Sequence, residues 1–566
     1  MTRVIPVAPA QAGPILQIPC SCKLFNAMRV PHDGGNNVRS FILLLLLMFT
    51  CHVSLAEPQI SQETVKAFFD GAFHVQKQDH DLAGVTVSVV YENQVLFKAG
   101  YGYADIEAGT PVDPDKTLFR IASISKPFVW TAIMQLHEQG KLDLDDDVNQ
   151  YLNGWQIPAT YDEPVRIWHL LTHTPGLEDH AIGMNARDLD EVMPLADYLQ
   201  DNVPRRVRPP GTFASYSNWS TSLAGHIIEQ VTEQTWSDYV DQHILQPLAM
   251  HATNAHQPMA DELMANHAKS YRHGNGELEV QGFQYLNDSP AGVMSTTADD
   301  MTRFMIAHLN DGEWNGHRIL QPDTARRMQS PLFEVHDRIP PMLHGFYRAD
   351  LNDQVIYGHG GDTNQFHSQL ALFPQHGLGI FVSFNSDPGA AARSNLIPAF
   401  VDHFFPKPHL LPPPDVVDID LADYTGEYLP LRRNHSNIMK LSNLVTVSNI
   451  SAGQARLLWA GSAWMPVAPD MFRARYSEQY LVFTRDEQGV VTHVVAGSPL
   501  GTLNRVSGLD APSNQQLIIG LIIVIALAAA LGYAYAGVFL RHLPNRLPNA
   551  HVLIAWVHAV ALLALY

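Results

Sequence analysis

The feature that most constrains this chain is an uncharged apolar stretch near its end, residues 517–540. The stretch is longer than the ~20 residues that a transmembrane helix requires, and it shows no polar face that would suit a buried core helix. Arg541, His542 and Arg546 follow it, with no acidic residue before the next apolar run, residues 551–566. By the positive-inside rule this basic loop is cytoplasmic, so we expect the bulk of the chain on the other side of a membrane.

A second targeting signal lies near the beginning of the chain. A basic residue, Arg39, precedes a short apolar run that ends in the small residues of Ser54-Leu55-Ala56. This pattern is typical of a secretory signal peptide. We therefore predict a signal peptide at 1–56, a transmembrane helix at 517–540 and a second one at 551–566, which is short for a span. The predicted protein is exported and membrane-anchored, and it faces the periplasm or the cell exterior.

Composition excludes several function classes. The 566 residues include 36 Lys and Arg against 56 Asp and Glu, a net charge of −20, and no basic block, which argues against nucleic acid as a partner. All three cysteines precede residue 52, so the processed protein has no disulfide or thiolate chemistry. We expect no cofactor and no metal. His169 and His173 lack a third ligand for zinc, and the acidic run 143–147 lacks the glycine and glutamate of a calcium loop.

The exported part divides at a proline-rich linker, residues 406–417. Before it, a domain at 57–405 has hairpin-like strand pairs near both ends, at 85–97 and 366–384, with helical patterns between them. This order predicts an α+β domain with an antiparallel sheet that is flanked by helices and closed by the two ends of the domain.

After the linker, residues 418–510 indicate a different architecture. Short strand-like pieces at 443–447, 480–483 and 490–495 are separated by Gly and polar turns. This spacing predicts a small all-β domain, a barrel or a sandwich, without obvious chemistry of its own.

Three short motifs in the first domain carry reactive groups. Ser123 precedes Lys126 at a helix start, where a neutral amine can take the serine proton. Tyr216-Ser217-Asn218 offers a phenol and an amide, and Gly358-His359-Gly360-Gly361 offers a strand edge that a substrate can approach closely. Each motif alone has an ordinary interpretation: a helix start with a solvated lysine, a polar loop and a glycine turn.

In this order along the chain, the three motifs resemble the serine β-lactamase and penicillin-binding family. The resemblance points to its branch of class C β-lactamases, DD-peptidases and esterases, and it covers about residues 60–405. Three further segments carry the same resemblance: Trp168–Leu177, Pro210–Met250 and Pro290–Thr296.

The resemblance implies an acyl-enzyme mechanism. By position, Ser123 is the acylated nucleophile, and Lys126 and Tyr216 are the proton-transfer pair. Asn218 orients the acyl side of the substrate. Further binding groups implied at the third motif are His359, Gly360 and Gly361, and the implied oxyanion hole consists of the backbone N–H groups of Ser123 and Asp362.

His359 departs from the family pattern. Penicillin-recognising members generally have a lysine there, whose charge helps to bind a substrate carboxylate, whereas histidine is mostly neutral at physiological pH. We therefore do not expect strong β-lactamase activity, and esterase or peptidase-like members are similar to this pattern.

The sequence thus predicts a membrane-anchored serine hydrolase that acts on a small-molecule or peptide-like acyl substrate. β-Lactamase, carboxylesterase, DD-peptidase and D-amino-acid amidase activities stay open, as does the oligomeric state. The alternative from another class is a penicillin-binding-like sensor or scaffold that is acylated without turnover.

Overall fold

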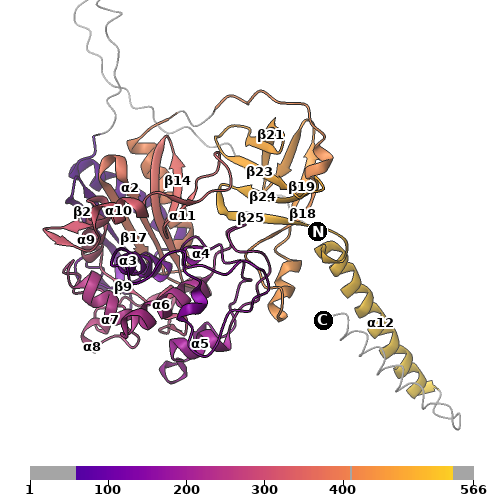
Figure 1. Ribbon diagram of the computed structural model, residues 1–566, viewed down its shortest axis with the longest axis horizontal. Helices are drawn as coiled ribbons and strands as arrows, with labels where there is room; N and C mark the ends of the chain where they lie inside the picture. Colours follow the sequence, from indigo (N-terminus) through magenta and orange to yellow (C-terminus); the bar gives the residue numbers. More distant parts are fainter. Residues whose placement is uncertain (1–58, 408–410, 540–566) are drawn as a thin grey trace, which may run out of the picture. The chain divides into compact units, whose positions relative to one another are not determined.

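The computed structural model describes residues 59–407 and 411–539. The signal peptide predicted at 1–56 and the apolar run 551–566 lie outside these residues. The described chain contains an α+β domain, an all-β barrel and a long C-terminal helix (Figure 1).

The α+β domain is built on an antiparallel sheet of nine strands, in the order β12-β13-β14-β15-β16-β17-β1-β2-β3. Strand β1 from the beginning of the domain pairs with β17 from its end, which confirms that the two ends of the domain close the sheet. Both predicted hairpins are present, as β1–β2 and β16–β17. The strand bounds are β1 (Gly84–Tyr91), β2 (Gln94–Asp105), β3 (Thr110–Pro111), β12 (Pro331–Phe333), β13 (Met342–Leu343), β14 (Tyr347–Leu351), β15 (Gln354–Asp362), β16 (His367–Phe373) and β17 (Leu378–Phe384).

Helices cover both faces of this sheet, because alternate strand residues are apolar on both sides (Figure 1). On one face, Val85, Val87 and Val89 of β1 pack in a core with the terminal helices α2 (Gln62–His80) and α11 (Gly389–Phe404). On the other face lies a larger core that includes the helices bearing the reactive motifs. The helices of the domain's interior are α3 (Ser125–Glu138), α4 (Ile167–Leu171), α5 (Leu195–Asp201), α6 (Asn218–Thr232), α7 (Trp236–Val240), α8 (Asp261–Met264), α9 (Ala298–Leu309) and α10 (Pro322–Met328).

Short strand pairs outside the main sheet hold the connecting segments. One of them, β4 (Phe119–Arg120) with β9 (Ser295–Thr296), lies directly before Ser123 in the sequence. The other pairs are β5 (Asn185–Ala186) with β8 (Tyr285–Leu286), β6 (Ser270–Gly274) with β7 (Glu277–Gln281), and β10 (Glu313–Trp314) with β11 (His317–Arg318).

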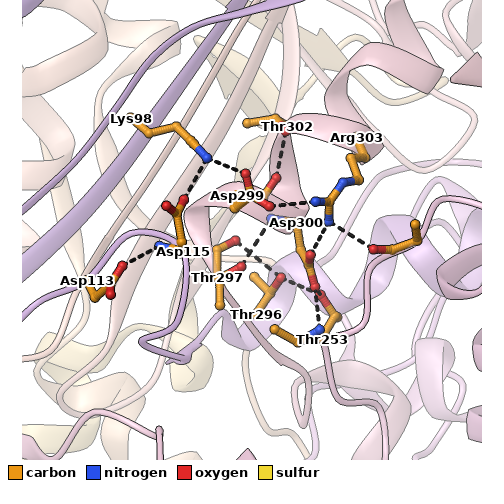
Figure 2. A network of polar contacts seen from close by, with 12 residues as sticks. Lys98, Asp113, Asp115, Thr253, Thr296, Thr297, Asp299, Asp300, Thr302 and Arg303 are labelled. Atoms are coloured by element: carbon orange, nitrogen blue, oxygen red, sulfur yellow. Dashed lines mark hydrogen bonds and ion pairs between the residues drawn. The ribbon is translucent and has the colours of Figure 1, made fainter. Parts of the chain in front are cut away.

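A polar network fixes the segment around β9 (Figure 2). Asp299 and Asp300 in the first turn of α9 lie at its centre, and Arg303 bonds both carboxylates. Lys98 of β2 pairs with Asp299, and the Thr253 hydroxyl donates to Asp300 at 2.8 Å. The network ties the start of α9 to the sheet, and β9 leads directly into that start. The strand pair that precedes Ser123 therefore has a rigid support.

The all-β part is a closed barrel of eight antiparallel strands. Aromatic side chains dominate its core, among them Tyr424, Tyr428, Phe472 and Phe483. The expected small β-domain is thus a barrel rather than a sandwich. Its strands are β18 (Gly426–Pro430), β19 (Ser448–Gly453), β20 (Arg456–Trp459), β21 (Ser462–Ala468), β22 (Met471–Ala474), β23 (Tyr480–Arg485), β24 (Val491–Ala496) and β25 (Ser498–Val506).

The strand predicted at 443–447 is wrong. A 3-10 helix, Ile438–Leu444, and a turn occupy this segment, and β19 begins only at Ser448. Asn437 caps the helix by accepting from the Met439 amide at 2.9 Å, and Val445 is 83% exposed. The apolar residues that suggested a strand therefore do not face the barrel core.

Helix α12 (Pro512–Phe539) exposes most of its apolar residues between Leu517 and Leu531. Residues Pro512–Leu531 have a mean hydropathy of 2.1, and side chains such as Leu517 and Leu531 are exposed. Within the described residues, α12 is the helix that is long and apolar enough to cross a membrane, judged by length and composition.

Candidate active site

Ser123 lies in a 3-10 turn directly before α3. The α-helix begins at Ser125, so Ser123 lies two residues before the helix and Lys126 lies in its first turn. Ala122 has a φ of 48°, in the left-handed region that residues other than glycine rarely adopt. The Ser125 hydroxyl braces this strained turn by donating to the Ala122 carbonyl at 2.7 Å. Ser123, directly after this strained residue, lines a cavity.

Lys126 is fully buried, and its amine contacts three oxygens. Nζ lies 3.1 Å from Ser123 Oγ, 2.8 Å from Asn218 Oδ1 and 2.7 Å from the Ala291 carbonyl oxygen. Burial lowers the pKa of Lys126 to about 7; the charge of Asp288 opposes this shift and the charge of Arg432 adds to it. A neutral amine is thus accessible near pH 7 within hydrogen-bond reach of a serine hydroxyl.

Tyr216 approaches the same hydroxyl from the other side. Its Oη donates to Ser123 Oγ at 2.8 Å, and its ring lies 4.9 Å from Lys126 Nζ. Burial raises the pKa of Tyr216 to about 12, although the hydrogen bond to Ser123 opposes this shift. The phenol therefore keeps its proton at neutral pH, which suits a proton donor, while Lys126 suits the base.

Asn218 is the first residue of α6, and Ser217 caps the helix by accepting from the Ser220 amide at 3.1 Å. The cap fixes the side chain of Asn218 next to the amine of Lys126, which donates to its Oδ1. The Nδ2 group lies 3.3 Å from Met184 Sδ, a weak acceptor, at the wall of the cavity. An amide donor is thus left for a substrate carbonyl.

Strand β15 carries the third motif along the sheet edge of the cavity. A Cβ at Gly361 would lie 2.0 Å from the Ile121 carbonyl, so only glycine lets the strand lie this close to the turn of Ser123. At Gly360 a Cβ would meet Arg393 Nη1 at 2.6 Å. Asp362, at the end of β15, lines the same cavity as Ser123. Two backbone segments suitable for an oxyanion hole therefore meet in one cavity, which we name the serine cavity.

The serine cavity has a volume of about 220 Å³. A second cavity of about 590 Å³ adjoins it and shares Gln284 and Thr363 as lining residues. Together they leave room for a substrate larger than a simple ester. The serine cavity is lined by Ala122, Ser123, Met184, Asn185, Asn218, Gln284, Leu286, Asp288, Ala291, Gly292, Asp362, Thr363 and Asn364.

His359 lies on β15 but does not offer a charge to a substrate. Only 1% of the residue is exposed, and its ring packs against Tyr347 at 4.3 Å and Tyr216 at 6.2 Å between centroids. Burial, together with the charge of Lys126, lowers the pKa of His359 to about 3. The imidazole is therefore neutral at physiological pH, and it supports the Tyr216 ring.

His169 and His173, the pair considered as metal ligands, form hydrogen bonds with nearby backbone groups. His169 Nδ1 accepts from the Arg166 amide at 2.8 Å, and His173 Nδ1 accepts from the Ser217 amide at 3.3 Å. His173 also packs on the Tyr216 ring, with centroids 4.5 Å apart. Both imidazoles thus hold backbone segments around the site.

Sequence reasoning missed a cation that comes from the barrel part of the chain. Arg432 follows β18, and its guanidinium carbon lies 4.8 Å from the centre of the Tyr216 ring. Its Nε pairs with Asp179 at 3.2 Å. The loop is held by Glu178, whose carboxylate accepts from the backbone N–H groups of His435 and Ser436. No motif marks Arg432, because its position depends on a contact between distant parts of the sequence.

Sequence reasoning also missed Asp288. This residue is 2% exposed and lines the serine cavity, and its Oδ1 has no hydrogen-bond partner among the described residues. It immediately precedes a 3-10 turn, Ser289–Ala291, whose last carbonyl receives the Lys126 amine. The sequence does place an acidic residue two positions before the Pro290–Thr296 segment. The burial of that residue, however, could not be predicted from the sequence.

Comparisons with known proteins agree with this geometry. The sequence matches the family described as Beta-lactamase over residues 69–399. Protein flp of Staphylococcus aureus (strain MW2) is 26% identical over 57% of this chain, and the match spans 64% of that protein, less than two thirds of its length. A beta-lactamase of Yersinia enterocolitica is 26% identical over 55% of this chain and 76% of that protein.

Solved structures with the same fold include the octameric penicillin-binding protein homologue from Pyrococcus abyssi, with a TM-score of 0.52 and 19% identity. SurE with D-Leu gives a TM-score of 0.56 and 22% identity. Each covers 78% of this chain, with 99% and 100% of the respective relatives matched. The family match extends over most of the domain in which Lys126 and Tyr216 contact Ser123, and we conclude that this chain belongs to the Beta-lactamase family of serine hydrolases.

Proposed function

We propose that this protein hydrolyses an ester or an amide through a covalent acyl-enzyme on Ser123. The observation that carries the proposal is the double contact of Ser123 Oγ, with Lys126 Nζ at 3.1 Å and Tyr216 Oη at 2.8 Å. A nucleophile between a buried amine and a protonated phenol has both a proton acceptor and a proton donor within reach.

In the acylation step, neutral Lys126 takes the hydroxyl proton while Ser123 Oγ forms a bond to the substrate carbonyl carbon. The backbone N–H groups of Ser123 and Asp362 stabilise the oxyanion, and Asn218 Nδ2 holds the acyl side. The tetrahedral adduct collapses when the bond to the leaving group breaks and the leaving group takes a proton, which passes from Lys126 by way of Tyr216. Water then attacks the acyl-enzyme by the reverse proton path, which releases the acid and restores Ser123.

The substrate class follows from Arg432. Tyr216 delivers the proton to the leaving group, so a cation against its ring faces the leaving-group side of the substrate. Since the neutral His359 cannot bind a carboxylate there, Arg432 is the group suited to this role. We therefore favour peptide-like substrates whose leaving group carries a carboxylate over simple neutral esters, and over β-lactams that rely on a lysine at position 359.

We further propose that the protein is exported and tethered by α12. The proposal is supported by the exposed apolar surface of this helix and by the basic residues that follow it in the sequence. In this arrangement the active site faces the periplasm or the cell exterior, and its substrates are envelope-type peptides or esters. Fractionation of cells that express the full chain tests this, with accessibility to external protease as the readout.

Labelling with a fluorophosphonate probe tests the chemistry. The full-length chain in detergent should become labelled on Ser123, as mapped by mass spectrometry, and it should hydrolyse members of a panel of esters, amides and β-lactams with multiple turnovers. Ser123→Ala should abolish both. Labelling without multiple turnover of any substrate supports the sensor or scaffold instead, and absence of labelling contradicts the proposed nucleophile.

A further inference from the structure

The buried carboxylate of Asp288 has no role in the mechanism above. It lines the serine cavity together with Ser123 and Asn218, and 2% of the residue is exposed. Its Oδ1 is fully buried without a hydrogen-bond partner in the described ranges, and the carboxylate makes no ion pair there. An acidic oxygen without a partner therefore lies in the wall of the cavity where a substrate must bind.

The neighbouring cations do not satisfy this carboxylate. The three N–H bonds of a charged Lys126 point to Ser123, Asn218 and the Ala291 carbonyl, which leaves none for Asp288. Arg120, also buried, donates instead to the backbone carbonyl of Gln284 and lies over the Phe283 ring at 4.9 Å. Both cations act on Asp288 through space only, without a contact.

A carboxylate in this position costs free energy unless it is protonated or paired with a cation. Burial raises the pKa of Asp288 well above its usual range, although the charge of Lys126, a hydrogen bond from the backbone N–H of Asp288 itself and the charge of Arg120 oppose this shift. The group is thus prepared to take either a proton or a positively charged ligand. Because no side chain in the described ranges bonds Oδ1, a positively charged group of the substrate is the ligand that suits it.

We propose that Asp288 binds an ammonium group on the acyl part of the substrate, so that the enzyme selects α-aminoacyl esters or amides. The proposal rests on the function proposed above and deepens it. Asn218 holds the acyl side in the same cavity, and an ammonium one carbon away from the reacting carbonyl fits beside it. Arg432 is absent from the lining of the serine cavity, so recognition of an acyl ammonium and of a leaving-group carboxylate are spatially separate.

The first experiment uses the native full-length chain and three matched acyl groups: alanyl in both enantiomers, N-acetylalanyl and propionyl, each as the methyl ester and the p-nitroanilide. At pH 7 we expect kcat/KM for the preferred alanyl enantiomer to exceed kcat/KM for propionyl by about tenfold or more, because the alanyl ammonium forms an ion pair in a buried site. N-acetylalanyl, which lacks the charge, should not share this preference. A propionyl substrate that is cleaved as well as alanyl overturns the proposal.

The second experiment removes the charge of Asp288 with Asp288→Asn, which keeps the size and shape of the side chain. The alanyl-to-propionyl ratio should fall by about tenfold or more. An equal loss for both substrates overturns the proposal, because it assigns Asp288 to positioning of Lys126. Asp190→Asn is the matched control: it removes one negative charge from an exposed residue and should leave the ratio unchanged.

A third readout measures occupancy of the site rather than the rate of turnover, and it needs no variant. Alaninamide should slow fluorophosphonate labelling of Ser123 at concentrations about tenfold lower than propionamide. Equal protection by the two amides overturns the inference while labelling itself supports the proposed function. If Ser123 is not labelled at all, the proposed function fails and the inference fails with it.

Discussion

The active site and the barrel differ in how they arrange their charged side chains. In the barrel, the partly exposed Arg485 pairs with Asp470 at 2.8 Å and with Asp423 at 3.2 Å, beside a core rich in aromatic rings. In the α+β domain, Lys126 and Asp288 are buried without an ion pair, next to a strained turn. Unpaired buried charge costs stability, and a protein retains it where it has chemistry to perform. Under the proposed function, the difference places the chemistry in the α+β domain and gives the barrel a supporting role.

The two regions nevertheless contact each other, for example where Phe213 packs on His493 and Ile339 on Val482, and one of these contacts reaches the active site. Arg432 leaves the barrel after β18 and lies against Tyr216, and Glu178 of the α+β domain anchors its loop. The barrel part of the chain thus supplies a positive charge next to the active site, whereas the third motif has the neutral His359 instead of a lysine. The following predictions test this division of labour, from the largest expected effect to the smallest.

Replacement of the nucleophile tests the assignment of chemistry to the α+β domain. Ser123→Ala should lower kcat for any substrate by about 10⁴-fold or more, because no other group in the cavity can form the acyl-enzyme. The thermal unfolding midpoint should change little, since the serine hydroxyl contributes to a site and not to a core. Activity that persists at native levels in this variant would place the chemistry elsewhere in the molecule.

The pH dependence tests the role of Lys126 as the base. Its pKa is lowered from the usual value to about 7, mainly by burial, so the neutral amine becomes available as pH rises through that value. For a neutral ester, kcat/KM should rise about tenfold per pH unit below about pH 7 and level off above it. Tyr216, with its raised pKa, keeps its proton over this range.

The same profile measured on Arg432→Ala sharpens the comparison. The charge of Arg432 lowers the pKa of Lys126, so its removal should shift the midpoint of the profile to higher pH. A midpoint that stays in place would show that Arg432 has no electrostatic influence on the base, and a midpoint that moves to lower pH would contradict the direction of that influence.

Arg432 is also predicted to recognise a leaving-group carboxylate. Arg432→Ala should lower kcat/KM for a carboxylate-bearing peptide substrate by about tenfold more than for its amidated counterpart, and Arg432→Lys should restore part of the difference. Arg475→Ala is the control, because it removes a barrel cation that stacks on Tyr476 instead. A uniform loss on both substrates would make Arg432 a packing residue.

The anchor of the Arg432 loop should have the smallest effect. Glu178 accepts hydrogen bonds from His435, Ser436 and Arg205, so Glu178→Gln should cost about 1–3 kcal/mol of the free energy of unfolding. The loss of carboxylate preference should be only severalfold. Chemical denaturation measures the loss of stability, and the ratio of kcat/KM for the carboxylate-bearing and amidated substrates measures the loss of preference. An unchanged free energy of unfolding would contradict the anchoring role.

This anchor also predicts a direction of pH dependence for stability. Burial raises the pKa of Glu178, but the hydrogen bonds from Ser436 and His435 outweigh it and lower the pKa overall. The contribution of Glu178 to stability is therefore complete above its unfolded-state pKa and is lost as pH falls through the folded-state value.

Several features were readable from the sequence because their signals are local. Alternation of apolar and polar residues marks the β1–β2 hairpin, and an apolar run at 517–540 marks α12. The order of the Ser123, Tyr216 and Gly361 motifs pointed to their family, which the comparisons confirm. At 443–447 the same local pattern predicted a strand, and this prediction was wrong because these residues do not pack in the barrel core.

The sequence by itself determined the secondary-structure pattern, the family and the types of reactive group, since periodicity, composition and motif order are properties of neighbouring residues. Only the tertiary structure decided which groups are charged and what they face: the burial of Lys126 and His359, the orphaned carboxylate of Asp288 and the approach of Arg432. The physical reason is that desolvation and ion pairing depend on packing between distant segments, and no spacing along the chain records that packing.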